Sequence, residues 1–162
     1  MFLYLSISQQ SLTVFASEQD RAEPVRTFKI STALNGMGSE KNSGKTPTGR
    51  LMVRAKIGQG LPMNSVFVAR RPTGEIYSDA LAQSAPNRDW ILTRILWLSG
   101  MEVGQNRLGN VDTMQRYIYI HGTPDTEPMG VPKSHGCIRM RNQDVLALFD
   151  LIPVGTEMVV AA

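Results

Sequence analysis

The chain's only cysteine and both of its histidines fall within one short segment. His121, His135 and Cys137 lie in a polar stretch rich in Gly and Pro. A thiol and an imidazole are the minimum parts of an activated nucleophile, because the imidazole can remove the thiol proton. No side chain outside this segment titrates near neutral pH at its ordinary pKa. We therefore expect any nucleophilic chemistry of this protein to take place here.

The two histidines differ in how they can reach the thiol. His135 lies two residues before Cys137, and neighbouring side chains on one strand diverge and seldom align for proton transfer. His121 lies sixteen residues before Cys137, and a loop of that length can fold back beside the sulfur. We favour His121 as the general base and His135 as a residue that shapes the pocket. A third group should orient the imidazole, and Asp125, Glu127 or a backbone carbonyl would serve.

The residues around Cys137 also favour an oxyanion site. Gly136 removes a side chain from the approach to the sulfur and permits unusual backbone angles. We expect a sharp turn between Cys137 and a helix beginning at Asn142, with backbone N–H groups pointing toward the sulfur. One lost oxyanion donor typically costs ~10² to 10³ in rate. The rival chemistry is a zinc site from His121, His135 and Cys137, which needs a fourth ligand or a water and matches no usual zinc spacing.

Most of the chain is predicted to form short strands separated by turns. Alternating or continuous apolar runs mark the strands, and clusters of Gly, Pro, Asn and Ser separate them. The expected strands cover residues 2–8, 12–16, 25–31, 51–57, 66–70, 75–77, 89–98, 117–120 and 157–160. The strand 117–120 would deliver His121 at its end. Most of the polar, Gly-rich segment 35–49 is expected to form a flexible surface connection.

One helix is clearly marked after the cysteine. Asn142 is the expected N-cap, and Asp144 in the first turn suits the helix dipole. Pro153 and Gly155 end the helix. Its apolar residues recur at i, i+3, i+4 and i+7 and define one face: Val145, Leu148, Phe149 and Ile152. The chain is therefore predicted to be mostly β, a β-sandwich of short strands with one marked α-helix after Cys137.

The composition fits a single globular domain over residues 1–162. The 162 residues are 42% hydrophobic and 19% charged, which suffices for a normal core. The net charge of +3 comes from scattered Lys and Arg, which argues against nucleic acid as a partner. One cysteine cannot form an intrachain disulfide, and no apolar run is long enough to cross a bilayer. The first ten residues lack the basic region of a signal peptide.

Three large side chains between residues 89 and 98 are candidate binding residues. Arg94 would lie among leucines of a strand and needs a partner, so a buried structural pair is favoured over carboxylate binding. Trp90 and Trp97 are expected to pack in the core rather than line a groove.

The sequence Ser134-His135-Gly136-Cys137-Ile138-Arg139, with Tyr119-Ile120-His121-Gly122-Thr123 upstream, resembles the catalytic domain of the L,D-transpeptidases, the YkuD-like family. The segment Thr46-Pro47-Thr48-Gly49 resembles that family's turn between early strands, and the resemblance covers nearly the whole chain. It implies a β-sandwich with a helix after the catalytic cysteine, in agreement with the fold expected from the residue pattern.

The resemblance implies acyl transfer on bacterial peptidoglycan. The cysteine would attack the carbonyl of the diamino acid at the third position of a tetrapeptide stem, D-alanine would leave, and an amine would take the acyl group from the thioester. Cys137 matches the nucleophile, His121 the general base, and Gly122 the residue whose carbonyl orients the base. The oxyanion and substrate-binding side matches Ser134, His135, Gly136 and Arg139. Arg139 would meet a substrate carboxylate or form a structural salt bridge.

The resemblance also implies the partners and the compartment. They are peptidoglycan tetrapeptide stems, carbapenem-type inhibitors, and the periplasm or cell envelope, with no cofactor and no metal. Water in place of the amine would make the protein an L,D-carboxypeptidase or stem hydrolase that uses the same Cys/His site. A non-catalytic wall-binding or zinc-binding module is the third alternative.

Overall fold

The computed structural model describes residues 1–162, and all of its strands belong to one sheet. Its ten strands are β1 (Phe2–Ser6), β2 (Ser11–Phe15), β3 (Arg26–Lys29), β4 (Gly49–Ile57), β5 (Ser65–Val68), β6 (Arg71–Ile76), β7 (Ile91–Gly100), β8 (Tyr119–Thr123), β9 (Ile138–Arg141) and β10 (Glu157–Ala161). The helices are α1 (Asp79–Ser84) and α2 (Asn142–Leu151), and a 3₁₀ turn covers Gly109–Val111. The mostly-β prediction is confirmed.

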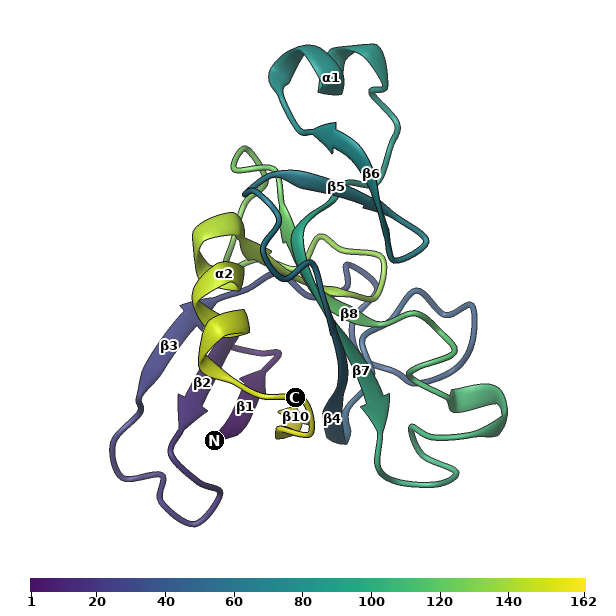
Figure 1. Cartoon of the computed structure of the whole chain (residues 1–162). Coiled ribbons are helices and arrows are strands. Elements are labelled where there is room, and N and C mark those ends of the chain that lie inside the picture. Colours follow the sequence, from purple (N-terminus) through teal and green to yellow (C-terminus); the bar gives the residue numbers. More distant parts are fainter.

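The sheet folds over on itself and is nearly closed. Its strands run in the order β3-β2-β1-β10-β4-β7-β5-β6, and β8 branches from β7 to pair with β9. Just past β3, Ser31 exchanges two backbone hydrogen bonds with Arg139 of β9, with N···O distances of 2.9 and 2.8 Å. The first and last strands, β1 and β10, pair in parallel in the middle of the strand order. The two terminal strands of the chain therefore lie side by side (Figure 1).

The main core fills the space between the two halves of the sheet and is covered by α2. Residues from β1–β4 and β7–β10 contribute to it, together with the apolar face of α2. That face is the predicted one, because Val145, Leu148, Phe149 and Ile152 are all buried. The predicted N-cap is wrong. Arg141 occupies the cap position, and Asn142 begins the helix with a side chain that is buried and bonded inward.

Two elements near the cysteine differ from the prediction. Cys137 does not lead directly into a helix, because the four-residue strand β9 intervenes. His121 lies in the middle of β8 rather than after its end. Both strands are too short to show an alternation that could be separated from the polar motif around them.

The segment 35–49 is held more firmly than the sequence predicts. Thr46 is fully buried, and its hydroxyl donates to the Gly136 carbonyl at 2.9 Å and accepts from the Ala33 N–H at 3.0 Å. Its second half is therefore not a flexible surface connection. The reason is a tertiary contact with the cysteine segment, which composition does not reveal.

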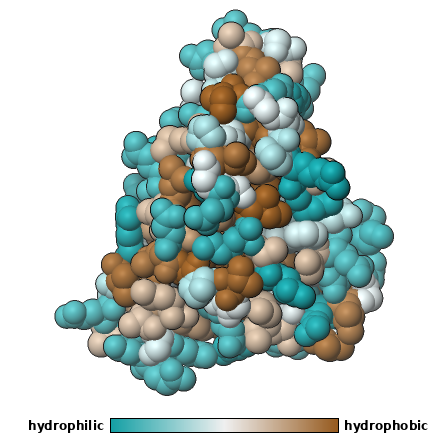
Figure 2. All heavy atoms as spheres, in the orientation of Figure 1, coloured by the Kyte–Doolittle hydropathy of each residue, from teal (hydrophilic) through white to brown (hydrophobic).

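The strands β5 and β6 and the helix α1 form an arm that projects from the sheet (Figure 1). The helix α1 was not predicted, because it has six residues and buries none of them; the Ser78 hydroxyl caps it by accepting from the Leu81 N–H at 3.1 Å. Hydrophilic side chains alternate with small hydrophobic patches on the face shown in Figure 2, and the arm forms its narrow end. Neither helix has the length and apolar character needed to cross a bilayer.

Candidate active site

The pairing of β8 with β9 brings the histidine and the cysteine together. The two strands are parallel, with Ile120 opposite Ile138 and His121 opposite Arg139. Because side chains alternate along a strand, both isoleucines enter the core while His121 and Arg139 share the other face. Cys137 immediately precedes β9, and it lines the same pocket as His121 and Arg139. The pairing of the two strands thus brings together His121 and Cys137, which lie sixteen positions apart in the sequence.

His121 and Cys137 line one pocket of about 410 Å³. Its walls include Arg70, Asp89, Arg116, Tyr119, Ser134 and Arg139. A second cavity of about 450 Å³ lies between the N-terminus and residues 153–157, but it contains no nucleophile and no histidine. The chemistry therefore favours the pocket at Cys137 as the functional site.

The imidazole of His121 is held in one orientation by its own neighbour. Its Nδ1 lies 2.7 Å from the Gly122 carbonyl oxygen, and the residue is 2% exposed. Because a carbonyl can only accept, Nδ1 carries the proton and Nε2 keeps its lone pair. Burial lowers the pKa of His121, although the bond to Gly122 opposes that shift, so the ring is neutral at neutral pH. Asp125 and Glu127 bond elsewhere, to Asn142 and Arg139.

Gly122 is packed so closely that no larger residue fits. A Cβ there would collide with the Asn142 side-chain oxygen and would lie 2.7 Å from the Leu92 carbonyl. The Asn142 amide donates to the Thr123 carbonyl at 3.0 Å, and its oxygen accepts from the Thr93 hydroxyl at 2.6 Å. Asn142 therefore fixes the backbone that carries the Gly122 carbonyl.

Thr93 supports this arrangement from an unusual backbone conformation. Its φ is +73°, a rare value for a β-branched residue, and the register of β7 against β8 shifts at this point. The bulge turns the Thr93 hydroxyl toward Asn142. Sequence reasoning missed both residues, because Thr93 lies within an apolar run and Asn142 suits a helix cap.

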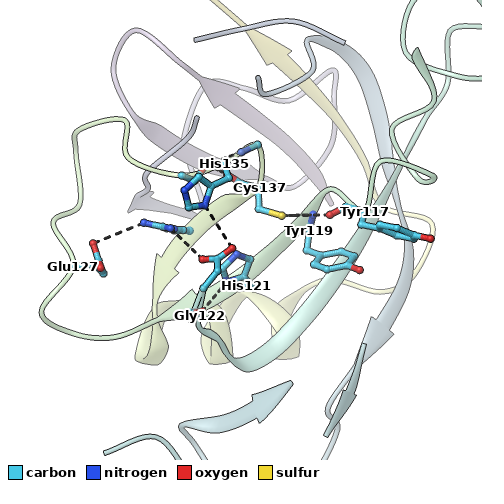
Figure 3. A network of polar contacts seen from close by, with 11 residues as sticks. Tyr117, Tyr119, His121, Gly122, Glu127, His135 and Cys137 are labelled. Carbon is cyan, nitrogen blue, oxygen red and sulfur yellow. Dashed lines mark hydrogen bonds and ion pairs between the residues drawn. The ribbon is translucent and has the colours of Figure 1, made fainter. Parts of the chain in front are cut away.

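The thiol of Cys137 is bonded to backbone rather than to the imidazole. Its sulfur accepts from the Tyr119 N–H at 3.3 Å and donates to the Tyr117 carbonyl at 3.4 Å (Figure 3). Burial raises the pKa of Cys137 to about 12; the Tyr119 N–H and the cations of Arg139 and Arg116 oppose this shift. The resting pair is therefore a neutral thiol beside a neutral imidazole.

The turn before Cys137 is built by Ser134 and Gly136. The Ser134 hydroxyl donates to the Cys137 carbonyl and accepts from the Gly136 N–H at 3.2 Å. Gly136 has a φ of +138°, where a side chain would be strained and its Cβ would lie 3.2 Å from Ile118. The backbone N–H of Cys137 donates to no protein acceptor. It is free to bind a developing oxyanion.

His135 and Arg139 meet at Asp89, a residue that sequence reasoning did not single out. His135 is 77% exposed, and its Nδ1 lies 3.6 Å from the Asp89 carboxylate. Arg139 lies 3.3 Å from the same carboxylate and 3.7 Å from Glu127, with 9% of its side chain exposed. Of its two expected contacts, Arg139 makes the structural salt bridge. Nowhere do three His, Cys, Asp or Glu side chains group as a metal site would require.

The three large side chains of β7 and its approach have structural contacts. Arg94 donates to the Leu61 and Thr93 carbonyls at 2.9 and 2.6 Å, so its partners are backbone groups and not a carboxylate. Trp90 packs in a small core cluster, as expected. Trp97 is half-buried and packs against the core cluster of Phe67, Ile95 and Tyr119, and its indole N–H donates to the Met114 carbonyl at 3.0 Å. The expectation of core packing is confirmed there in part.

Comparisons of the sequence and of the fold with known proteins all point to the L,D-transpeptidases. The family profile of YkuD, the L,D-transpeptidase catalytic domain, matches residues 2–160. A 43-residue segment is 46% identical to the probable L,D-transpeptidase YbiS of Escherichia coli K12, covering 26% of this chain and 14% of that protein. The chain therefore matches a small part of this curated relative's length.

Two solved structures share the fold over 99% of this chain. An L,D-transpeptidase from Mycobacterium smegmatis superposes with a TM-score of 0.56 at 18% identity, and this chain covers 58% of it. The L,D-transpeptidase LdtMt1, solved in complex with imipenem, gives 0.55 at 20% identity, again with 58% of that chain covered. The structure is a mostly-β domain with the fold of these L,D-transpeptidases. The chain belongs to the YkuD family of L,D-transpeptidase catalytic domains.

Proposed function

We propose that residues 1–162 form one catalytic domain that transfers an acyl group from a peptidoglycan tetrapeptide stem to an amine. Cys137 is the nucleophile and His121 the general base, with the Gly122 carbonyl orienting the imidazole. The observation that carries the proposal is the bond of His121 Nδ1 to Gly122, because it leaves the Nε2 lone pair free in a pocket shared with the thiol.

The neutral resting pair supports proton transfer at the moment of attack. Cys137 Sγ loses its proton to His121 Nε2 as the sulfur bonds to the carbonyl carbon of the diamino acid, and the carbonyl oxygen becomes an oxyanion. The free N–H of Cys137 and the turn held by Ser134 and Gly136 stabilise that charge. The imidazolium then gives its proton to the departing amine of D-alanine, which leaves a thioester on Cys137.

The second half of the reaction uses the same base. The acceptor amine loses a proton to His121 as it attacks the thioester carbon, and the proton returns to the Cys137 sulfur as the C–S bond breaks. Water in place of the amine would give hydrolysis with the same two residues. We place the enzyme in the periplasm or cell envelope, where its substrate lies, with roles in peptidoglycan biosynthesis, cell wall organisation and cell shape.

Carbapenems are proposed inhibitors, because their lactam carbonyl can react with the same nucleophile. The similar enzyme LdtMt1 was solved in complex with imipenem. A strained lactam carbonyl in the pocket would acylate Cys137 in the same way as the stem carbonyl. The expected result is one covalent imipenem adduct on Cys137.

The product assay on purified tetrapeptide stems tests the proposal directly. Native protein should release D-alanine and form stem dimers, and Cys137→Ala should do neither. Tripeptides without dimers would assign the hydrolase activity instead. Absence of D-alanine release and of an imipenem adduct would refute acyl transfer at Cys137.

A further inference from the structure

Arg70 lies at the wall of the catalytic pocket, on the tip of the hairpin between β5 and β6. Its guanidinium stacks on the Tyr117 ring at 4.4 Å and the Trp97 ring at 4.9 Å, and its Nη1 donates to the Tyr119 hydroxyl at 2.9 Å. Its other N–H groups have no partner in the protein. Three aromatic side chains thus hold a planar cation with free donors beside the pocket.

The turn that presents Arg70 adopts a conformation that its residues do not favour. Val68 pairs with Arg71, so Ala69 and Arg70 form a two-residue hairpin turn, with φ of +49° and +64°. Asn and Gly are the usual residues at these positions, because φ is positive at both. A long charged side chain kept on a strained backbone beside a catalytic pocket points to a function.

The two other arginines of this pocket are already occupied. Arg139 is paired with Asp89 and Glu127. Arg116 donates to the Lys45 carbonyl at 2.7 Å, to the Gly38 carbonyl at 3.3 Å and to Ser43, so it holds the 38–45 loop. Of the three, only Arg70 combines a single hydrogen bond with the absence of any carboxylate partner. A guanidinium fork matches a carboxylate in bidentate geometry.

The contacts of Arg70 also place it relative to the nucleophile. Figure 3 shows Tyr117 and Tyr119 on one side of the Cys137 sulfur and Glu127 on the other. Because Arg70 contacts both tyrosines, it lies on the side away from the Arg139 salt bridges. An anionic group there would meet a free cation, whereas at Arg139 it would have to displace Asp89.

We propose that Arg70 binds a carboxylate of the acyl donor and selects donors in which that carboxylate is free over donors in which it is amidated. The inference deepens the proposed function and rests on it. The bound carboxylate belongs either to the side chain of the diamino acid or to the departing D-alanine. Both present the same planar anion, so the two sources are separated by experiment.

Three tetrapeptide donors test this assignment: one with all carboxylates free, one amidated on the diamino-acid side chain, and one amidated at the terminal D-alanine. Initial rates of acyl transfer give kcat/KM for each donor with native protein, Arg70→Gln, Arg70→Lys and Arg71→Gln. Arg71 is the matched control, because it is the next residue, is exposed and does not line the pocket. The ratio between donors does not depend on how much of a variant is folded.

Native protein and Arg71→Gln should prefer the free donor over one amidated donor by about tenfold or more, as expected for a charge-assisted hydrogen bond. Arg70→Gln should bring that ratio close to one, mainly through KM, and Arg70→Lys should restore part of it. Turnover by native protein without discrimination, or an unchanged ratio in Arg70→Gln, would overturn the assignment of Arg70 alone. Failure of native protein to use any donor would overturn the proposed function as well.

Discussion

Burial favours the neutral form of the Cys137 thiol over the thiolate. Burial raises its pKa to about 12, whereas an ordinary cysteine titrates near ~8.5. The alkylation rate of native protein by iodoacetamide should therefore rise by about tenfold per pH unit from pH 7 to 10, because only the thiolate reacts. Mass spectrometry of the alkylated chain gives the rate at each pH. Unfolded protein is the control and should level off near ~8.5 to 9; a native profile that levels off there would contradict the raised pKa.

His121 and His135 should differ sharply in their effect on catalysis. The His121 ring is buried and tied to Gly122, whereas the His135 ring is exposed and faces Asp89. Loss of a general base costs ~10² to 10⁴ in rate, so His121→Gln should lower kcat by that amount. His135→Gln should lower it by less than about tenfold, the size of one weak contact. The measurement is D-alanine release from stems, and equal losses in both variants would reject His121 as the sole base.

At the scale of the elements, the site depends on a junction behind the catalytic face. Asn142 at the start of α2 accepts from Thr93 in β7 and donates to the Thr123 carbonyl in β8 and to Asn64. One side chain thus ties a helix, two strands and a loop together. Through Gly122 it also limits where the His121 ring can lie.

Replacing Asn142 should therefore cost stability as well as activity. Asn142→Leu removes these hydrogen bonds and leaves buried polar groups unpaired, so the free energy of unfolding should fall by ~2 to 4 kcal/mol. Gln143→Ala is the control, since Gln143 is exposed on the same helix, and it should change stability by ~0.5 kcal/mol or less. Urea unfolding followed by circular dichroism measures both. A loss in Asn142→Leu no larger than in the control would show that the junction is not needed.

The elements that sequence predicted are those with a local signal. The apolar face of α2 and the first two strands follow from periodicity. Three residues of the Ser-His-Gly-Cys motif line one pocket with His121. The bulge at Thr93, the strand β9, the burial of Thr46 and the Asp89 ion pairs all arise from contacts between distant segments. No window of sequence contains both partners of such contacts, so pattern reasoning could not find them.

At the scale of the whole molecule, the fold brings distant parts of the chain to one pocket, whose walls come from residues 69–70, 89–91, 116–121 and 134–139. The strands β1 and β10, from opposite ends of the chain, pair in parallel, and the Ser31–Arg139 bridge joins the first half of the chain to strand β9. His121, on β8 between β7 and β9, is buried in the folded domain. The protonation of that one imidazole is therefore linked to the folding of the entire domain.

This linkage predicts how stability depends on pH. Burial lowers the pKa of His121 in the folded chain, whereas the unfolded chain takes up the proton near ~6.5. Protons thus bind preferentially to the unfolded state as pH falls, so stability present above pH ~6.5 is lost below it, by up to ~1.4 kcal/mol per pH unit. Urea unfolding of native protein between pH 5 and 7.5 should show this slope, above the range where most carboxylates titrate.

The two histidine variants identify the source of that slope. His121→Gln should make the free energy of unfolding nearly independent of pH between about pH 5 and 6.5. No buried imidazole with a lowered pKa then remains in the folded chain. His135→Gln should keep the native slope, since its ring is exposed and does not depend on closure of the sheet. If His121→Gln retained the full slope, the acid sensitivity would come from another group. Burial of His121 would then not explain why the folded domain loses stability as the pH falls.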